Sequence, residues 1–160
     1  MWIKVRIAEQ VLELFEDAQP EPVKTYSIST ALNGVGQQEG SGQTPLGSHE
    51  IAQCIGGDCP ENAVFVGREW THEIYTPELA KEYPERDWIL SRILRLRGLE
   101  IGFNQGGNVD SYARYIYIHG TPDTEPMGVA KSHGCIRMRN SDLMALFEQV
   151  KEGTRVEIVA

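Results

Sequence analysis

Short segments in which apolar and polar residues alternate constrain this fold more than any other feature. At the N-terminus Ile3, Val5 and Ile7 occupy every second position, and a second such segment follows at 11–15. Sixteen glycines and eight prolines are spread along the 160 residues, as expected for many short strands joined by turns. Further strand candidates are 25–30, 48–55, 63–70, 99–103, 112–118 and 154–159. We therefore expect a mainly β fold with mostly antiparallel strands.

A few short helices interrupt this pattern. The stretches 77–83 and 88–94 are rich in helix formers and have helical spacing of apolar residues. Ser141 is a candidate N-cap for a third helix over 142–150, which would have one apolar face. The segment 71–96 is our candidate for a flap over a functional site.

Length and composition favour a single domain over residues 1–160. The chain is 41% apolar and 24% charged, and it has no repeat, linker or low-complexity tract. A net charge of −8 argues against a nucleic-acid partner, because phosphate binding needs a basic face. No cofactor-binding motif is present, and we expect no cofactor.

The N-terminal segment predicts a location. Lys4, Arg6 and Glu9 interrupt the apolar residues, so we find neither the core of a signal peptide nor a membrane anchor. We therefore expect a cytoplasmic protein that does not associate with a membrane. A periplasmic protein is the alternative if the N-terminus has been trimmed.

The segment Ser-His-Gly-Cys-Ile-Arg-Met at 132–138 contains a candidate nucleophile, Cys135. A thiolate attacks and a thiol does not, so this cysteine needs a base or a positive neighbour. The candidate bases are His133, two residues away, and His119, sixteen residues away at the end of a predicted strand. Gly134 leaves space beside the sulfur and lets backbone N–H groups face an oxyanion.

Two other interpretations of Cys135 stay open. It could be a zinc ligand together with His133, His119 and either Cys54 or Cys59, although the Cys-x2-Cys pairs of structural zinc sites are absent. It could also be a small buried hydrophobic residue. Cys54 and Cys59 are close enough in sequence to form a disulfide, but we expect free thiols in a reducing cytoplasm.

The surroundings of this segment are basic and compact. Lys131, Arg137 and Arg139 lie within nine residues, which indicates either an anionic small substrate or a solvated surface. A thiol–imidazole pair also needs a group that orients the second ring nitrogen. No carboxylate is obviously placed for this task, whereas the backbone carbonyl of Gly120, directly after His119, could perform it.

Three motifs together resemble a known family. Ile-His-Gly-Thr at 118–121, followed after ten residues by Ser-His-Gly-Cys-Ile-Arg-Met-Arg-Asn at 132–140, is similar to the active-site signature of the L,D-transpeptidase catalytic domain, or YkuD-like, family. Thr-Pro-Leu-Gly at 44–47, with the strand that follows it, resembles an upstream motif of the same family. The resemblance extends over residues 2–159.

This resemblance implies a YkuD-like β-sandwich with the cysteine in a cleft. It also implies a reaction on peptidoglycan stem peptides or muropeptides, at the bond between the L-centre of meso-diaminopimelate and the terminal D-alanine. By position, Cys135 would be the nucleophile, His119 its base and Gly120 the group that orients His119. The residues that would form the oxyanion site and the substrate pocket are Ser132, His133, Gly134 and Arg137.

The acceptor of the acyl group decides which reaction follows. Water gives an L,D-carboxypeptidase that trims tetrapeptide stems, and an amine of another stem gives a transpeptidase that forms cross-links. Because cross-linking requires export, the predicted lack of an export signal favours the carboxypeptidase of cell-wall recycling. The transpeptidase is the first alternative, and a non-catalytic wall-fragment or metal-binding module is the second.

Overall fold

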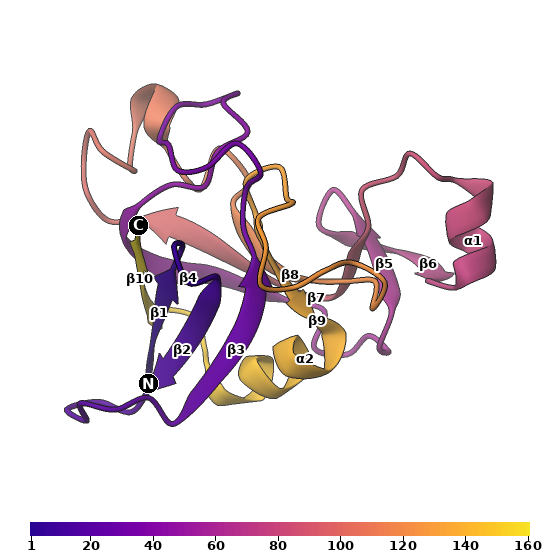
Figure 1. The fold of residues 1–160 in the computed structure, drawn as a ribbon, viewed down its shortest axis with the longest axis horizontal. Coiled ribbons are helices and arrows are strands. Elements are labelled where there is room, and N and C mark those ends of the chain that lie inside the picture. Colours follow the sequence, from indigo (N-terminus) through magenta and orange to yellow (C-terminus); the bar gives the residue numbers. More distant parts are fainter.

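The computed structural model describes all residues, 1–160, as ten strands, two α-helices and a single 3-10 turn (Figure 1). The strands are β1 (Trp2–Arg6), β2 (Val11–Phe15), β3 (Lys24–Ser29), β4 (Gly47–Ile55), β5 (Ala63–Val66), β6 (Glu69–Ile74), β7 (Ile89–Gly98), β8 (Tyr117–Thr121), β9 (Ile136–Arg139) and β10 (Arg155–Val159). The helices are α1 (Pro77–Glu82) and α2 (Asn140–Gln149), and the 3-10 turn is η1 (Gly107–Val109). Neither α-helix is long and apolar enough to cross a membrane.

All ten strands belong to one sheet that closes on itself. Its order is β4-β10-β1-β2-β3-β9-β8-β7-β5-β6, and an additional pairing of β4 with β7 closes eight of these strands into a barrel. The pairs β1–β10 and β8–β9 are parallel and the others are antiparallel. The β5–β6 hairpin therefore lies outside the barrel, next to β7, and projects with α1 from the main body (Figure 1).

The inside of the barrel holds the main core. Seventeen buried apolar residues pack there, and α2 contributes Leu143 and Leu146 to this cluster. A second, smaller cluster lies on the outer face of β7 and β8, under the β5–β6 hairpin, and Cys135 packs against it. Strands β7 and β8 are therefore buried on both faces, and the thiol lies on the outer side.

The mainly β, mostly antiparallel fold is confirmed, but several predicted local elements are wrong, among them the strand over 112–118, in which residues 112–115 form a turn. Residues 88–94 form the start of β7 instead of a helix, because a strand covered on both faces shows a continuous apolar run instead of alternation. Residues 99–103 form turns in which the Glu100 carbonyl accepts three backbone N–H groups. Ser141 lies inside α2, whose N-cap position is Arg139.

Candidate active site

Two neighbouring parallel strands, β8 and β9, place the thiol and the imidazole on the same face of the sheet. Their register pairs His119 with Arg137, and Cys135 directly precedes β9. The backbone N–H of Tyr117 donates to the Cys135 Sγ atom at 3.4 Å. Because side chains alternate along a strand, these four residues project from the outer face of the barrel, while the residues between them enter the core. Parallel pairing thus places two groups sixteen residues apart on one surface.

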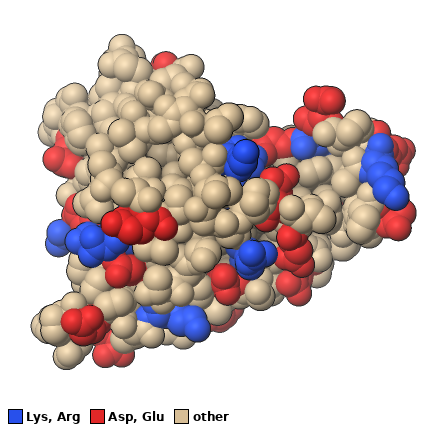
Figure 2. Space-filling view, viewed as in Figure 1, with Lys and Arg blue, Asp and Glu red and all other residues tan.

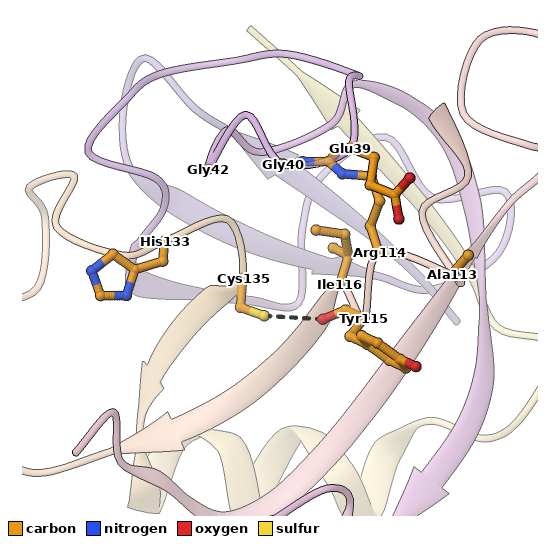
Figure 3. A pocket seen from close by; sticks show the side chains of 9 residues that line it. All are labelled: Glu39, Gly40, Gly42, Ala113, Arg114, Tyr115, Ile116, His133 and Cys135. Atoms are coloured by element: carbon orange, nitrogen blue, oxygen red, sulfur yellow. Dashed lines mark hydrogen bonds between the residues drawn. The ribbon is translucent and has the colours of Figure 1, made fainter. Parts of the chain in front are cut away.

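The thiol of Cys135 is protonated in the resting protein. Its Sγ–H group donates to the backbone carbonyl of Tyr115 at 3.3 Å, the contact drawn in Figure 3. Burial raises the pKa of Cys135 to about 11, although the Tyr117 N–H group and two nearby arginines oppose this increase. A pKa this high means that a base must remove the proton as the sulfur attacks.

The imidazole of His119 has the form that such a base requires. Its side chain is almost completely buried, with the residue 1% exposed, and this burial lowers its pKa. Its Nδ1–H group donates to the carbonyl of Gly120 at 2.7 Å. A carbonyl oxygen can only accept, so in the neutral ring Nε2 carries the free lone pair. Residue 120 must be glycine, since a Cβ atom there would collide with the Leu90 carbonyl and with Asn140.

Hydrogen bonds from both sides hold the loop that carries the thiol. The Ser132 hydroxyl donates to the carbonyl of Cys135 at 2.6 Å and accepts the backbone N–H of Gly134 at 3.3 Å. From the other side, the Thr44 hydroxyl donates to the carbonyl of Gly134 at 2.9 Å. Gly134 has a φ of +132°, a backbone conformation that favours glycine. The threonine of the upstream motif therefore shapes this loop directly.

A cavity of about 400 Å³ opens beside the thiol. Figure 3 shows Cys135 between His133 and Tyr115, with Arg114 and Glu39 on the wall beyond them. The Arg114 guanidinium donates to the carbonyl of Gln43 at 2.7 Å and so holds the loop that forms this wall. The cavity is large enough for several residues of a peptide.

A smaller cavity of about 110 Å³ lies on the other side of His133. Arg137 lines it, and its guanidinium lies 3.2 Å from the carboxylate of Asp87 and 3.7 Å from that of Glu125. The His133 ring is 78% exposed and its Nδ1 lies 3.9 Å from Asp87. His133 thus lies between the two cavities, and its ring points away from the larger one in Figure 3.

The family model described as the L,D-transpeptidase catalytic domain, YkuD, matches residues 1–158. This chain belongs to the L,D-transpeptidase catalytic domain family. Among curated relatives of this chain, the probable L,D-transpeptidase YbiS of Escherichia coli K12 is 48% identical over 52 residues. That stretch is 30% of this chain and 17% of YbiS. The putative L,D-transpeptidase YkuD of Bacillus licheniformis is 42% identical over 60 residues, 34% of this chain and 36% of that protein.

Solved structures show the same L,D-transpeptidase fold. The C442S mutant of the Enterococcus faecium L,D-transpeptidase has a TM-score of 0.59 at 16% identity, covering 99% of this chain and 49% of that one. An L,D-transpeptidase from Mycobacterium smegmatis has a TM-score of 0.58 at 17% identity, covering 99% of this chain and 58% of that one. The YkuD-like fold expected from the motifs is therefore confirmed.

Most of the site residues predicted for an L,D-transpeptidase meet in one place. Cys135 and His119 share a face of the sheet, the Gly120 carbonyl orients the ring, and Ser132 and Gly134 shape the loop. The two remaining predicted residues are His133 and Arg137, which were expected to help form the oxyanion site and the substrate pocket. The ring of His133 is in solvent, and the Arg137 guanidinium lies near two carboxylates of its own chain.

Three residues of the site escaped the sequence analysis. Asp87 reaches Arg137 from the segment before β7, forty-eight residues upstream of the thiol. Arg114 and Tyr115 belong to a stretch predicted as strand, which instead turns at Tyr115 with a φ of +57°. No spacing rule connects these positions with Cys135, and only the folded chain places them beside the sulfur.

The structure gives no support to the zinc interpretation. Nowhere in the chain do three His, Cys, Asp or Glu side chains come together in an arrangement that could hold a metal ion. Cys54, Cys59 and Cys135 are separate free thiols. The exposed ring of His133 lies toward Asp87 and Arg137.

Proposed function

We propose that this chain is a cysteine-dependent L,D-carboxypeptidase that removes the terminal D-alanine from peptidoglycan tetrapeptide stems. The observation that carries the proposal is the common face of β8 and β9, which holds a partly buried thiol and an imidazole whose Nε2 is free to accept a proton. Membership of the L,D-transpeptidase family supports the substrate class. No step requires a metal or a cofactor.

In the proposed first step, the Cys135 Sγ–H proton passes to His119 Nε2 while sulfur attacks the carbonyl carbon of the L-centre of diaminopimelate. The tetrahedral oxyanion accepts hydrogen bonds from backbone N–H groups of the 133–135 loop. As the intermediate collapses, the imidazolium gives its proton to the departing amine. Free D-alanine leaves, and the stem remains bound as a thioester.

In the second step His119 removes a proton from a water molecule, and the resulting hydroxide attacks the thioester carbonyl. The tripeptide leaves with a carboxyl group, and the proton returns to the sulfur. Because the resting pair is a neutral thiol and a neutral imidazole, each proton transfer accompanies bond formation at the carbonyl carbon.

The size of the cavity beside Arg137 favours water as the acceptor. At about 110 Å³ it fits a water molecule or a fragment the size of D-alanine, whereas a second stem peptide needs a longer groove. Trimming of soluble wall fragments is a reaction of cell-wall recycling, so we propose the cytoplasm as its location. Cell fractionation with an antibody against this chain tests the location directly.

A cross-linking L,D-transpeptidase is the second candidate. The curated relatives are named as probable or putative L,D-transpeptidases, which supports an amine of another stem as the acceptor. Both candidates share the thioester, so only the products distinguish them. With cross-linking as the reaction, the periplasm would be the expected location.

Mass spectrometry of a soluble muropeptide tetrapeptide incubated with the protein tests the proposal. We expect loss of D-alanine and formation of tripeptide by the wild type, and no loss by Cys135→Ala. Cross-linked dimers as the main product would replace the carboxypeptidase by the transpeptidase. Undiminished release by Cys135→Ala would rule out both, and no turnover of any stem peptide by the wild type would favour the non-catalytic module.

A further inference from the structure

Three arginines without an acidic partner meet beside the thiol. The chain has ten arginines, and five of them lie within 4.0 Å of a carboxylate. Of the other five, Arg68, Arg95 and Arg114 all lie next to Tyr115, whose carbonyl contacts the Cys135 sulfur. In a protein with a net charge of −8, three arginines without an ion pair next to a single residue indicate an anionic ligand.

Arg68 is the accessible member of this group. It lies at the turn between β5 and β6, and its guanidinium carbon is 4.8 Å from the centre of the Tyr115 ring. One N–H group donates to the Tyr117 hydroxyl at 3.2 Å, and the other donors have no partner within the chain. This hydrogen bond holds the side chain in place, and the remaining N–H groups of the guanidinium are free to donate to a ligand.

Arg95 is the buried member, with 7% of its surface exposed. Its guanidinium stacks on Tyr112 at 3.5 Å and lies 5.0 Å from the Tyr115 ring. It donates to a carbonyl and an amide oxygen, while its Nε atom is buried without a partner. The nearby carboxylate of Asp110 accepts backbone N–H groups instead. Arg95 thus forms no direct ion pair, although Asp110 is close enough to feel its charge, and a buried cation of this kind strengthens the attraction for an anion that binds close by.

Arg114 extends the positive charge into the larger cavity. It lines this cavity together with Cys135, and its hydrogen bonds go to neutral carbonyl and hydroxyl oxygens. Glu39 is the only acidic residue on the cavity wall, and it forms no ion pair with Arg114. Arg68 and Arg95 therefore lie against the Tyr115 ring, and Arg114, the next residue along the chain, lines the cavity beside it.

We propose that Arg68, together with Arg114 and the field of the buried Arg95, recognises a carboxylate of an acidic peptide substrate. Tyr115 forms the platform between the cations. This inference rests on the proposed function and deepens it, because it specifies which stem peptides are preferred. A tetrapeptide stem has two suitable groups before the scissile bond, the free carboxylate of the D-glutamyl residue and the side-chain carboxylate of diaminopimelate.

Binding to the Cys135→Ala protein tests the site without turnover. The probes are the free-acid tetrapeptide and two analogues, one with the glutamyl carboxylate amidated and one with the diaminopimelate side-chain carboxylate amidated. We expect the free acid to bind about tenfold more tightly than at least one analogue, as for one charge-assisted bidentate contact. The analogue that loses affinity identifies the carboxylate.

Variants of Arg68 then assign the contact. Arg68→Gln should abolish the preference for the free acid and leave the affinity of the weaker analogue unchanged, and Arg68→Lys should retain part of it. Arg155→Gln is the matched control, since Arg155 also stacks on an aromatic ring but lies on β10. It should retain the full preference.

Two outcomes overturn this inference. Equal affinity for all three peptides excludes a carboxylate site, and an equal loss for all three in Arg68→Gln shows that the residue supports the fold only. The proposed function fails separately, when the wild type releases no D-alanine. A preference for the free acid without turnover would support the carboxylate site and contradict the proposed function. Turnover without such a preference would contradict the carboxylate site alone.

Discussion

The barrel and the projecting segment that consists of β5, β6 and α1 differ in how they are held together. The barrel encloses a cluster of seventeen buried apolar residues. The projecting segment rests on clusters of only four and three, and α1 has no buried residue at all. In Figure 1 this segment extends away from the barrel, joined to it along β7.

These two regions contribute different parts of the active site. The barrel strands β8 and β9 hold Cys135 and His119, whereas the projecting segment and the residues after α1 contribute Arg68 and Asp87. The proposed catalytic pair, whose reaction requires accurate distances, therefore lies in the region with the large core. Two of the charged groups proposed to act at the site, Arg68 and Asp87, come from the projecting segment and the residues after it, where the sequence can change at little cost in stability.

Replacing the proposed base should have the largest effect on activity. We expect His119→Gln to lower the rate of D-alanine release by about 10² to 10⁴, the usual contribution of a general base. The matched control is His72→Gln in β6 of the projecting segment, which should stay within about twofold of the wild type because surface substitutions away from the site change little. Equal losses in the two variants would contradict the assignment of the chemistry to the barrel.

Cavity-forming substitutions should separate the two regions in stability. Leu94→Ala removes a fully buried side chain from the barrel core and should lower the free energy of unfolding by about 2–5 kcal/mol. Leu79→Ala in α1 removes a partly buried one and should cost about 1 kcal/mol or less. Urea unfolding followed by tryptophan fluorescence measures both. A loss at Leu79 as large as that at Leu94 would show that the projecting segment is an integral part of the core.

Acid should destabilise the barrel through its two buried histidines. Burial lowers the pKa of both His49 and His119, so each folded-state pKa lies below the unfolded value of about 6.5. The unfolded chain then binds more protons below that pH, and stability is present above about pH 6.5 and is lost as the pH falls toward the folded pKa values. We expect Tm to decrease between pH 7.5 and 5, and to decrease less in His49→Gln. A Tm that does not change over this range would contradict the prediction.

The smallest expected effect concerns the charge that the segment before β7 brings to the thiol. The negative charge of Asp87 contributes to the raised pKa of Cys135. Asp87→Asn should therefore accelerate alkylation of Cys135 by iodoacetamide at neutral pH, by about two- to fivefold. Mass spectrometry distinguishes Cys135 from Cys54 and Cys59, and Glu78→Gln on α1 is the control. A slower or unchanged reaction would mean that Asp87 acts only by holding Arg137.

Local patterns predicted most of the barrel and the centre of the site. Alternating segments identified β1, β2, β3, β4 and β10, because each has one face in the core and one in solvent. The motif residues Cys135 and His119 lie on the outer face of two paired strands, and Gly120 accepts a hydrogen bond from the His119 ring; their catalytic roles stay predictions. The strand predictions succeeded because the alternation that identifies each of these strands lies within one short stretch of sequence.

The pattern failed where burial depends on distant parts of the chain. The start of β7 was predicted as a helix because its apolar residues face the barrel on one side and the β5–β6 hairpin on the other. The role expected for Arg137 could not be judged without Asp87, which lies far away in sequence. In both cases the deciding contact joins segments that no local window contains.

The sequence alone determined the mainly β character, the family and the pair of residues suited to thioester chemistry, because these depend on periodicity and on short motifs. The tertiary structure decided the protonation states, because the pKa of Cys135 and that of His119 both depend on burial of the side chain. It also decided which arginines pair with acids and which remain unpaired beside the thiol. Burial and ion pairing are properties of the packed chain, and only the closed barrel with its projecting hairpin creates them.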